Sequence, residues 1–559
     1  MKISNKMVEV KTMQGLQPRT KLSMTAIAMI QALKNTDSHL GLFLRQDRAA
    51  ESKFLAYCEM YQKIAAYMEY FRAAGVAAGS RVLFPFETTE GVIIAFFALV
   101  GLGAIPLSVK PYSMGVVKES YLEFLTKVTT QYQAEFVLEA PSIRSLELSL
   151  QRLQLPDTDI QPQESANFAT ITDTDIAFVQ FSFGSTSFPK GIPVTHGKIV
   201  AQMQAIANHA QNRPSDATAS WLPLYHDMGL VGGLLTTLYL RHNLHLSTPM
   251  HFLMNPVEWL SELSEKKIAI AVIPDFAISY CLRRLAITDP EEIANLNLTQ
   301  LRMVFNGSEP INIDKLHQFL EVLAPYGLQA TAIKPCYGMA EAVLMISCCK
   351  LEEVPRIVTL ANGCKAISVG QALSTFDIRL RTEDGLLCHE GEVGEVELRG
   401  GTLVDNYFES ERPFYNCDGF FPTGDLGVIS EGELFVTGRL NDRFKINGQS
   451  YFASDFEHAI ESLPFVQPSK VATIQADDRI IILIETKQAS VLQQLIDHQR
   501  QVSEIVLNQL GIKIPVDNIL FIRPGQLEKT SSGKLRRIAI AQAYITGKIM
   551  LAKNARNGC

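Results

Sequence analysis

A loop rich in glycine and hydroxyl groups, with one lysine, has the composition of a phosphate-binding site. It lies in the stretch QFSFGSTSFPKGIPVTHG, residues 180–197, after the strand-like run Ile176–Ser182. Backbone N–H groups and hydroxyls in such a loop can hold anionic oxygens, and Lys190 adds positive charge. The alternative is a surface turn between a strand and a helix. We favour phosphate binding because other stretches of the chain support it.

The loop does not match the two best-known nucleotide-binding patterns. A Walker A loop needs a second glycine followed by lysine, but Pro189 occupies the position of that glycine and Ile192 follows Gly191. The spacing G-x-G-x-x-G does not occur in this stretch either. The sequence therefore argues against a P-loop NTPase and against a dinucleotide site here.

Three further stretches place chemically active side chains where predicted strands end. WLPLYHDMGL, residues 221–230, brings His226 and Asp227 to a strand-to-helix junction, where an Asp can also simply cap the helix. FNGSEPI (305–311) and CYGMAEAV (336–343) each follow an apolar run. Ligands of open α/β sheets gather at the carboxyl ends of the strands, so we expect all three stretches to face one site.

Individual side chains in these and later stretches suggest separate roles. Tyr337 could stack on a base, and Glu341 could hold a hard cation through its carboxylate. A core tyrosine and a solvated helix acid are the simpler alternatives. FPTGDLG predicts a tight turn at Asp425, a common position for a structural Asp. LEKTSSGKLRR, residues 527–537, is a second hydroxyl-rich basic loop, for which a solvated tail is the simpler alternative.

An alternation of apolar runs and helix-like segments must position these side chains. SRVLFPF (80–86) predicts a strand, Val92–Leu102 a helix and Ile105–Val109 a buried strand. This order is typical of an α/β domain whose parallel sheet is covered on both faces. The uncharged span 91–109 is just long enough to cross a bilayer, but Gly103 breaks it, so we expect no transmembrane segment.

The pattern changes twice along the chain. After residue 369, FDIRLRTEDGLL, GEVGEVELRG and GVISEGELFVTG alternate in polarity and contain hairpin turns. Past Asn441 the sequence predicts a helix, a hairpin and another helix. We therefore predict a large N-terminal domain, residues 1–438, of doubly wound α/β sheets with a small antiparallel β subdomain, and a small mobile α+β C-terminal domain, residues 439–559.

Composition excludes several classes of protein. The chain has 559 residues, more than one core usually supports, and a net charge of −7, which argues against a nucleic-acid partner. Its nine cysteines show no CxxC pair and no zinc spacing. The N-terminus lacks the apolar core of a signal peptide. We expect a cytoplasmic, reducing environment.

Taken in order, the motifs resemble those of the AMP-forming adenylating-enzyme superfamily, which includes acyl-CoA synthetases and standalone adenylation domains. The phosphate loop is followed by YHDMGL, NGSEP, YGMAEA, TGDLG, GRLNDRFKINGQSYF and KTSSGKLRR. WLPLYHDMGL, NGSEP, YGMAEA and GQSYFASDFE are most similar to the fatty-acyl-AMP ligases, which activate fatty acids and deliver them to carrier proteins. Such enzymes serve polyketide, lipopeptide or related lipid biosynthesis.

The resemblance implies a reaction and a set of site residues. ATP and a carboxylate, here a fatty acid, would form an acyl adenylate and pyrophosphate with Mg²⁺, and the acyl group would then pass to the phosphopantetheine arm of an acyl carrier protein. The catalytic residues implied are Lys534, Glu341, His226 and Thr186, of which Glu341 and Thr186 would bind the metal. The nucleotide-binding residues implied are Ser185, Thr186, Lys190, Asn306, Gly307, Ser308, Glu309, Tyr337, Gly338, Met339, Asp425, Arg439 and Lys534. Asn441 would occupy the hinge.

Some features depart from the family pattern and keep alternatives open. Phe183 and Ser187 alter the phosphate loop, which leaves a weakly catalytic ligand-binding member as one alternative. The stretch from Ala342 to Val369 has 28 residues, short for the insertion that fatty-acyl-AMP ligases usually carry, so an acyl-CoA synthetase is a second. Asp227 could bind an α-amino group, which makes an amino acid adenylating enzyme the third.

Overall fold

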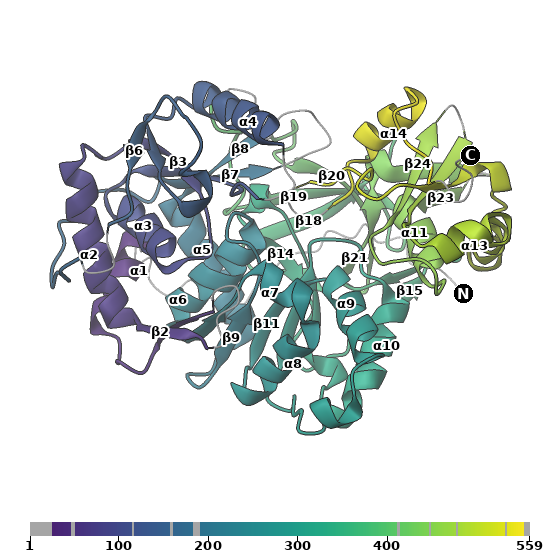
Figure 1. Ribbon diagram of the computed structural model, residues 1–559, viewed down its shortest axis with the longest axis horizontal. Helices are drawn as coiled ribbons and strands as arrows, with labels where there is room; N and C mark the ends of the chain where they lie inside the picture. Colours follow the sequence, from purple (N-terminus) through teal and green to yellow (C-terminus); the bar gives the residue numbers. More distant parts are fainter. Residues whose placement is uncertain are drawn as a thin grey trace.

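The protein is described by a computed structural model for residues 25–45, 51–113, 117–156, 160–182, 190–410, 414–446, 449–476, 479–530 and 534–552. Two large sheets with helices packed on them form most of the molecule, and a small antiparallel sheet lies next to them. A smaller α+β part, built by the C-terminal residues, lies beside these layers at the upper right of Figure 1.

Both large sheets are mainly parallel. The nine-stranded sheet has the spatial order β17 (Gln371–Ala372), β14 (Met345–Cys348), β13 (Ile333–Gly338), β12 (Met303–Gly307), β11 (Ile270–Pro274), β9 (Ala217–Ser220), β10 (Asn243–Leu246), β1 (Gly41–Leu44) and β2 (Lys53–Ala56). The six-stranded sheet has the order β6 (Gln151–Leu153), β5 (Phe136–Leu138), β3 (Arg81–Pro85), β4 (Ile105–Val109), β7 (Ile176–Ser182) and β8 (Lys190–Thr195).

Helices connect these strands and cover the sheets. They are α1 (Ala26–Ala32), α2 (Tyr57–Ala73), α3 (Glu90–Gly101), α4 (Lys118–Gln131), α5 (His196–Ala210), the π-helix η3 (Met228–Leu235), α6 (Thr236–Leu240), α7 (Pro249–Met254), α8 (Pro256–Glu265), α9 (Phe276–Leu285) and α10 (Ile313–Leu323). Their starts follow from sequence: Thr195, Asn255 and Asn312 each cap a helix by accepting a backbone N–H in its first turn.

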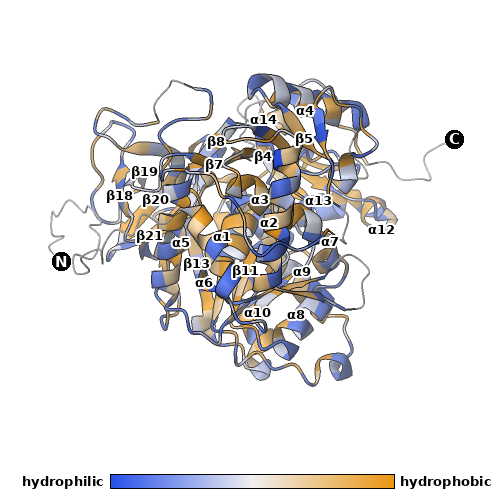
Figure 2. Ribbon diagram, turned by 90° about the vertical axis from the view of Figure 1, so that its left-hand side faces the viewer, coloured by the Kyte–Doolittle hydropathy of each residue, from blue (hydrophilic) through white to orange (hydrophobic). Residues whose placement is uncertain are grey.

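Burial explains why the apolar runs form these elements. All five residues of β11 are buried, as expected for a parallel strand covered on both faces. The helix predicted over Val92–Leu102 is α3, whose residues from Val92 to Gly101 are all buried, and the predicted strand after it is β4. The predicted fold class is therefore confirmed. In Figure 2 the hydrophobic colour covers α3, whereas α4 carries hydrophilic segments.

The predicted antiparallel region is also present. Its sheet contains β18 (Phe376–Arg381), β19 (Gly394–Gly400), β20 (Phe421–Ser430) and β21 (Glu433–Arg439). Burial alternates residue by residue along β18, which is the pattern of a strand with one face on the core. The stretch from Ala342 to Val369 contains β14 and a separate hairpin, which is formed by β15 (Ile357–Thr359) and β16 (Lys365–Ile367).

The C-terminal part has hydrophobic clusters of its own, which include Phe456, Val502, Phe521 and Ile540. It contains β22 (Arg443–Ile446), β23 (Gln449–Phe452), α11 (Ala453–Glu461), β24 (Val471–Ala476), β25 (Arg479–Glu485), α12 (Ala489–Gln493), α13 (Leu495–Leu510), β26 (Ile519–Ile522) and α14 (Arg537–Ile545). The β15–β16 hairpin touches this part, because Asn362 Nδ2 donates to Ser450 O at 2.6 Å. The exact boundary at residue 438 stays a prediction.

None of the helices in the described ranges is long and apolar enough to span a bilayer. The uncharged span 91–109 instead divides into nearly all of α3 and the strand β4, which lie within the main hydrophobic cluster.

Gly438 allows the C-terminal part to pack closely on β21. A Cβ at this position would overlap the ring of Phe452, which is buried at the end of β23. We predict that Gly438→Ala lowers the free energy of unfolding by about 1–3 kcal/mol, the usual cost of overpacking a filled site. Urea unfolding measures this loss. Gly401→Ala is the control, since its Cβ would meet nothing within 4 Å. Equal stability of the two variants would contradict the prediction.

Candidate active site

A cavity of about 620 Å³ opens where the carboxyl ends of β9, β11 and β13 face the antiparallel sheet and the C-terminal part. The predicted residues that line it are Lys190, His226, Ser308, Tyr337, Gly338, Met339, Glu341, Asp425, Arg439 and Lys534, and Asp227 lines it as well. Asn306, Gly307 and Glu309 stand outside this lining. Ser185 and Thr186, with Phe183 and Ser187, lie outside the described residues.

Tyr337, Asp425 and Arg439 form a chain of contacts at one wall. Tyr337 Oη donates to Asp425 Oδ2 at 2.6 Å, and Arg439 Nε lies 3.3 Å from Asp425 Oδ1. Burial, then the Asp425 charge, raises the pKa of Tyr337 well above its ordinary value, so its hydroxyl stays a donor. The Arg439 side chain is 55% exposed, so its ion pair adds little stability. Arg439 also lines the cavity, so the part of its guanidinium that does not face Asp425 can meet a ligand there.

The sequence prediction of a tight turn at Asp425 was wrong. Asp425 lies within β20 and pairs with Arg439 of β21 in the ladder, at a point where the register shifts. Thr423 fixes the strand before it, because its Oγ accepts from Asp425 N at 3.0 Å and donates to Val396 O at 2.8 Å. The Gly424 backbone at φ +74° supplies the bend that the turn-like sequence TGD suggested.

The main chain forms another wall at the ends of β12 and β13. Ser308 adopts φ +77°, a conformation that a non-glycine residue seldom takes and that clusters at binding sites. A Cβ on Gly338 would overlap the Leu344 carbonyl, so only glycine fits there. Met339 N donates to that same carbonyl at 2.8 Å. These contacts leave peptide groups at the cavity edge, where a flat ring could approach them closely.

Glu341 lies on a single 3-10 turn, η7 (Ala340–Ala342), and not on a solvated helix. Its Oε1 accepts from Tyr407 Oη at 3.1 Å, and burial raises the pKa of the carboxyl. Lys190 Nζ stands 4.5 Å from the centroid of the Tyr407 ring. Tyr407 therefore connects the start of β8 to the acid, a role that no sequence motif indicated, because it depends on contacts between distant elements.

Asp227 caps a helix, as the simpler interpretation predicted, and it also lines the cavity. Its Oδ1 accepts from Met228 N at 2.7 Å at the start of η3, as a capping residue does. The same residue lines the cavity next to His226. The loop that carries both follows β9 directly, which places them at the carboxyl edge of the sheet.

Lys534 is the side chain that the C-terminal part contributes to the cavity lining. A turn holds it, since Thr530 N donates to Lys534 O at 2.7 Å and Lys534 N donates to Thr530 Oγ1 at 3.1 Å. Burial and the Arg439 charge lower the pKa of the lysine, while Asp227, Asp425 and Glu309 oppose that shift. The cavity therefore brings a desolvated cation next to a space that an anionic ligand can fill.

Glu309 and Asp275 form a layer of acids behind the lining. Glu309 Oε1 accepts from Phe276 N at 2.8 Å, and Asp275 Oδ2 accepts from Asn312 N at 3.1 Å. Burial raises the pKa of both carboxyls. Glu309 thus fixes the start of α9. No motif indicated Asp275, which follows an apolar strand like many turn residues.

Sheet order, the cavity and its residues define a nucleotide-dependent enzyme of two parts, and comparison with known families agrees. The chain belongs to the AMP-binding enzyme family, whose model matches residues 42–408. A second model, described as Disco-interacting protein 2-like, AMP domain, matches residues 441–554.

Named relatives extend over most of the chain. JamA of Moorena producens, a medium-chain-fatty-acid–[acyl-carrier-protein] ligase, is 30% identical and the match covers 68% of this chain and 69% of JamA. FadD26 of Mycobacterium tuberculosis, a long-chain-fatty-acid–AMP ligase, is 26% identical over 94% of this chain and 98% of its own. A structure from studies of fatty acyl-adenylate ligases of E. coli and L. pneumophila has TM-score 0.83, 26% identity, and coverage of 94% and 98%.

Glu461, a carboxyl at the end of α11, leads us to expect that the stability of the protein depends on pH. Glu461 Oε1 accepts from Ser469 N at 2.6 Å, and Glu457, Glu309 and Lys529 contribute charge. Burial and the two acids raise its pKa from 4.5 to about 7. Its contribution to stability is therefore full below about pH 4.5 and is lost as pH rises to 7.

We predict that Glu461→Gln, which stays neutral, becomes more stable than the wild type as pH rises from about 5 to about 8. The gain should be about 1–2 kcal/mol, reduced from the full value because the side chain is partly exposed. Urea unfolding at both pH values measures it, with Glu504→Gln on the exposed face of α13 as control. A difference that does not change with pH would contradict the assignment.

Proposed function

We propose that this chain activates a fatty acid with ATP to an acyl adenylate, releases pyrophosphate, and transfers the acyl group to the phosphopantetheine thiol of an acyl carrier protein. The chain is an AMP-forming acyl ligase, as its family and its named ligase relatives establish. The observation that carries the proposal is the convergence of Lys534, Glu341 and the Asp425–Arg439 pair, from separate parts of the chain, on one cavity.

Catalysis in this site is positioning and neutralisation of charge. Attack of a carboxylate on the α-phosphorus brings two anions together, so preorganised cations lower the barrier. Lys534 would contact the carboxylate and α-phosphate oxygens, and His226 would lie near the carboxylate. The pKa of Lys534, which burial lowers in the free enzyme, would rise again beside a bound anion.

The nucleotide would be held by the walls already described. We assign the ribose hydroxyls to Asp425 with Arg439, and the adenine to the Tyr337–Met339 strand end beside Ser308. Asn306, Gly307 and Glu309 would act from behind this wall as supports. Lys190 would reach the β- and γ-phosphates with Ser185 and Thr186.

Glu341 suits a magnesium ion. Its carboxylate lines the cavity, and no cluster of three or more His, Cys, Asp or Glu that could cage a metal occurs among the described residues. One carboxylate joined by phosphate oxygens and water is the ligand set that Mg²⁺ prefers in nucleotide sites. We propose Glu341 and Thr186 as its protein ligands; the bound ion would neutralise phosphate charge.

The two parts would act as an adenylating domain, residues 1–438, and a mobile lid, residues 439–559, with Asn441 at the hinge. Asn441 lies in the 3-10 turn η8 (Leu440–Asp442), and Asp442 pairs with Arg537 at 3.1 Å. A rotation at this turn would withdraw Lys534 from the cavity and allow a thiol to approach.

The acceptor is tested by direct comparison. With ATP, Mg²⁺ and octanoate, we expect acyl thioester to form on a phosphopantetheinylated carrier protein and not on coenzyme A, as measured by intact-mass spectrometry. Efficient acyl-CoA formation would overturn the choice of acceptor. Amino-acid-dependent pyrophosphate exchange without fatty-acid-dependent exchange would overturn the choice of substrate.

We predict that Lys534→Ala lowers the rate of acyl adenylate formation by about 10²–10³-fold, the usual effect of removing one preorganised charge. ATP binding should remain largely intact, because the lysine acts in the transition state. Single-turnover adenylation and ATP titration separate the two effects. Lys548→Ala, an exposed lysine near α14, is the matched control. Adenylation at the wild-type rate in Lys534→Ala would show that the lysine is misassigned.

A further inference from the structure

The cavity continues as an apolar limb beyond its nucleotide end. On one side the limb is lined by Ile270, Val272 and Pro274, alternate residues of β11 that share one face of the sheet. On the other side it is lined by Ile206 and Ala210 of α5, Gly232 of η3 and Leu240 of α6. The limb therefore runs along the sheet, from its carboxyl edge toward its amino edge.

The strand gives the limb a length. Pro274 and Ile270 are four residues apart, which is about 13 Å at roughly 3.3 Å per residue. An extended hydrocarbon advances about 1.3 Å per bond, given C–C bonds of about 1.5 Å, so the limb matches about ten carbons. Each methylene buried there favours binding by roughly fourfold.

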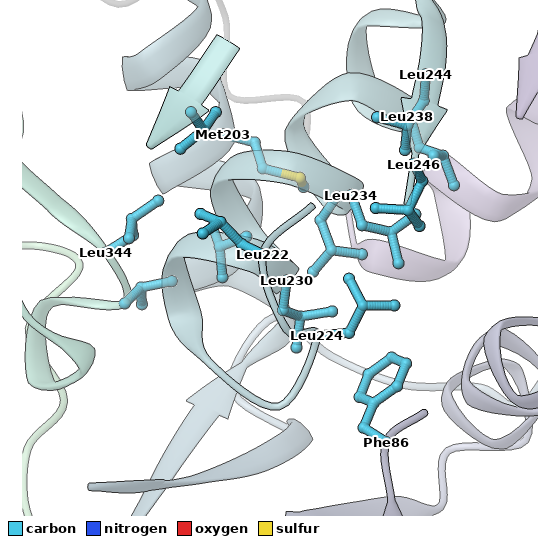
Figure 3. Close-up of a cluster of buried hydrophobic side chains, with 14 of the residues drawn as sticks. Phe86, Met203, Leu222, Leu224, Leu230, Leu234, Leu238, Leu244, Leu246 and Leu344 are labelled. Atoms are coloured by element: carbon cyan, nitrogen blue, oxygen red, sulfur yellow. The ribbon is translucent and has the colours of Figure 1, made fainter. Parts of the chain in front are cut away.

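The limb passes Gly232 at a point where this glycine packs directly against Leu344, which also lines the cavity. A Cβ on Gly232 would lie 3.1 Å from Leu344 Cδ2 and 4.0 Å from Val272 Cγ1. Leu344 belongs to the packed layer of leucines in Figure 3, with Leu222 and Leu230, so it has little freedom to withdraw. Any side chain larger than hydrogen at position 232 would therefore narrow the passage.

The wall that carries Gly232 is a π-helix, a form often found at functional sites. Two threonines that line the cavity hold it: Thr236 Oγ1 donates to Val231 O at 2.7 Å, and Thr237 Oγ1 donates to Gly233 O at 2.6 Å. Because both hydroxyls donate to the backbone, their protons are not available to a ligand. The helix turn around Gly232 is thus fixed and offers little polarity to the passage.

The far end of the limb is polar. Asn212, just after the left-handed Gln211 that ends α5, lines the cavity and donates from Nδ2 to Ala207 O at 2.9 Å. Thr218, which is 2% exposed, lines it from β9. A hydrocarbon that continued past this point would desolvate these groups, which is unfavourable.

We propose that Gly232 and Asn212 set the acyl chain length, so that the enzyme selects medium-chain fatty acids of about ten carbons. Because Gly232 has no side chain, it leaves the limb open to the acyl chain beside Leu344, and Asn212 closes the floor. This inference rests on the proposed fatty-acid activation and makes it specific.

Pyrophosphate exchange with butanoate, octanoate, decanoate, dodecanoate and hexadecanoate tests the proposal on the full-length enzyme. The wild type should have its highest kcat/KM with octanoate or decanoate. Gly232→Val should lower the ratio of kcat/KM for decanoate to that for butanoate by at least about tenfold, and Gly232→Ala should lower it less. Gly401→Val, in an open turn, should leave the ratio at its wild-type value.

Asn212→Ala should act in the opposite direction and raise the ratio for hexadecanoate over decanoate by about fivefold or more, since it removes the floor. If the wild type exchanges pyrophosphate with no fatty acid, the proposed function fails. If fatty acids are activated but neither Gly232 variant changes the decanoate-to-butanoate ratio, or the wild type prefers hexadecanoate, the proposed function stands and this inference is overturned. Thermal unfolding of each variant shows whether it is folded, and Gly232→Ala serves as the milder test.

Discussion

The hydrogen bond from Tyr337 Oη to Asp425 Oδ2 joins two independent sheets, and the geometry of the site depends on it. Tyr337 ends a strand of the nine-stranded sheet, and Asp425 lies inside the antiparallel sheet. Because both groups are buried, little water competes for this hydrogen bond. Loss of either partner would leave the other without a hydrogen-bond partner. The bond thereby sets the distance between the main-chain wall at Gly338 and the Arg439 guanidinium at the chain's predicted boundary.

Several charged side chains surround this bond, and we expect a ligand to stabilise their charged forms. Lys534 and Arg439 oppose each other, and burial lowers the pKa of the lysine while the Asp425 charge raises that of the arginine. On the acidic side, burial raises the pKa of Glu341 and of Glu309. Lys534, Glu341 and Glu309 are therefore less stable in their charged forms than they would be in water, whereas Arg439 is more stable as a cation. An anionic ligand with a divalent cation would relieve both sets at once, which couples ligand binding to the approach of the C-terminal part.

Much of this arrangement was predictable from sequence, because it rests on local patterns. The apolar runs that became β3, α3 and β4 are buried as their composition indicated, and strand ends brought His226, Tyr337 and Glu341 to one edge of a sheet. The error at Asp425 has a local cause: TGD is a turn sequence, and here Gly424 bends a strand without ending it. Tyr407 and Asp275 could not be found, since their roles arise only when distant elements meet. For Ser185 and Thr186 the sequence remains the only guide.

The same distinction explains why short sequence motifs indicate the residues proposed for the chemistry but not those proposed for chain-length specificity. The groups that we propose to hold the phosphates and the ribose lie in short stretches with a recognisable composition, such as the TGD that contains Asp425, so these stretches suffice to predict them. Three residues set the width of the acyl limb at one point: Gly232 of the π-helix, Leu344 from the loop before β14, and Val272 of β11. No spacing relates these three positions, and each belongs to a segment that would be apolar in any case. Chain length can therefore change through single substitutions at such contacts while the motifs, and the reaction they support, stay the same.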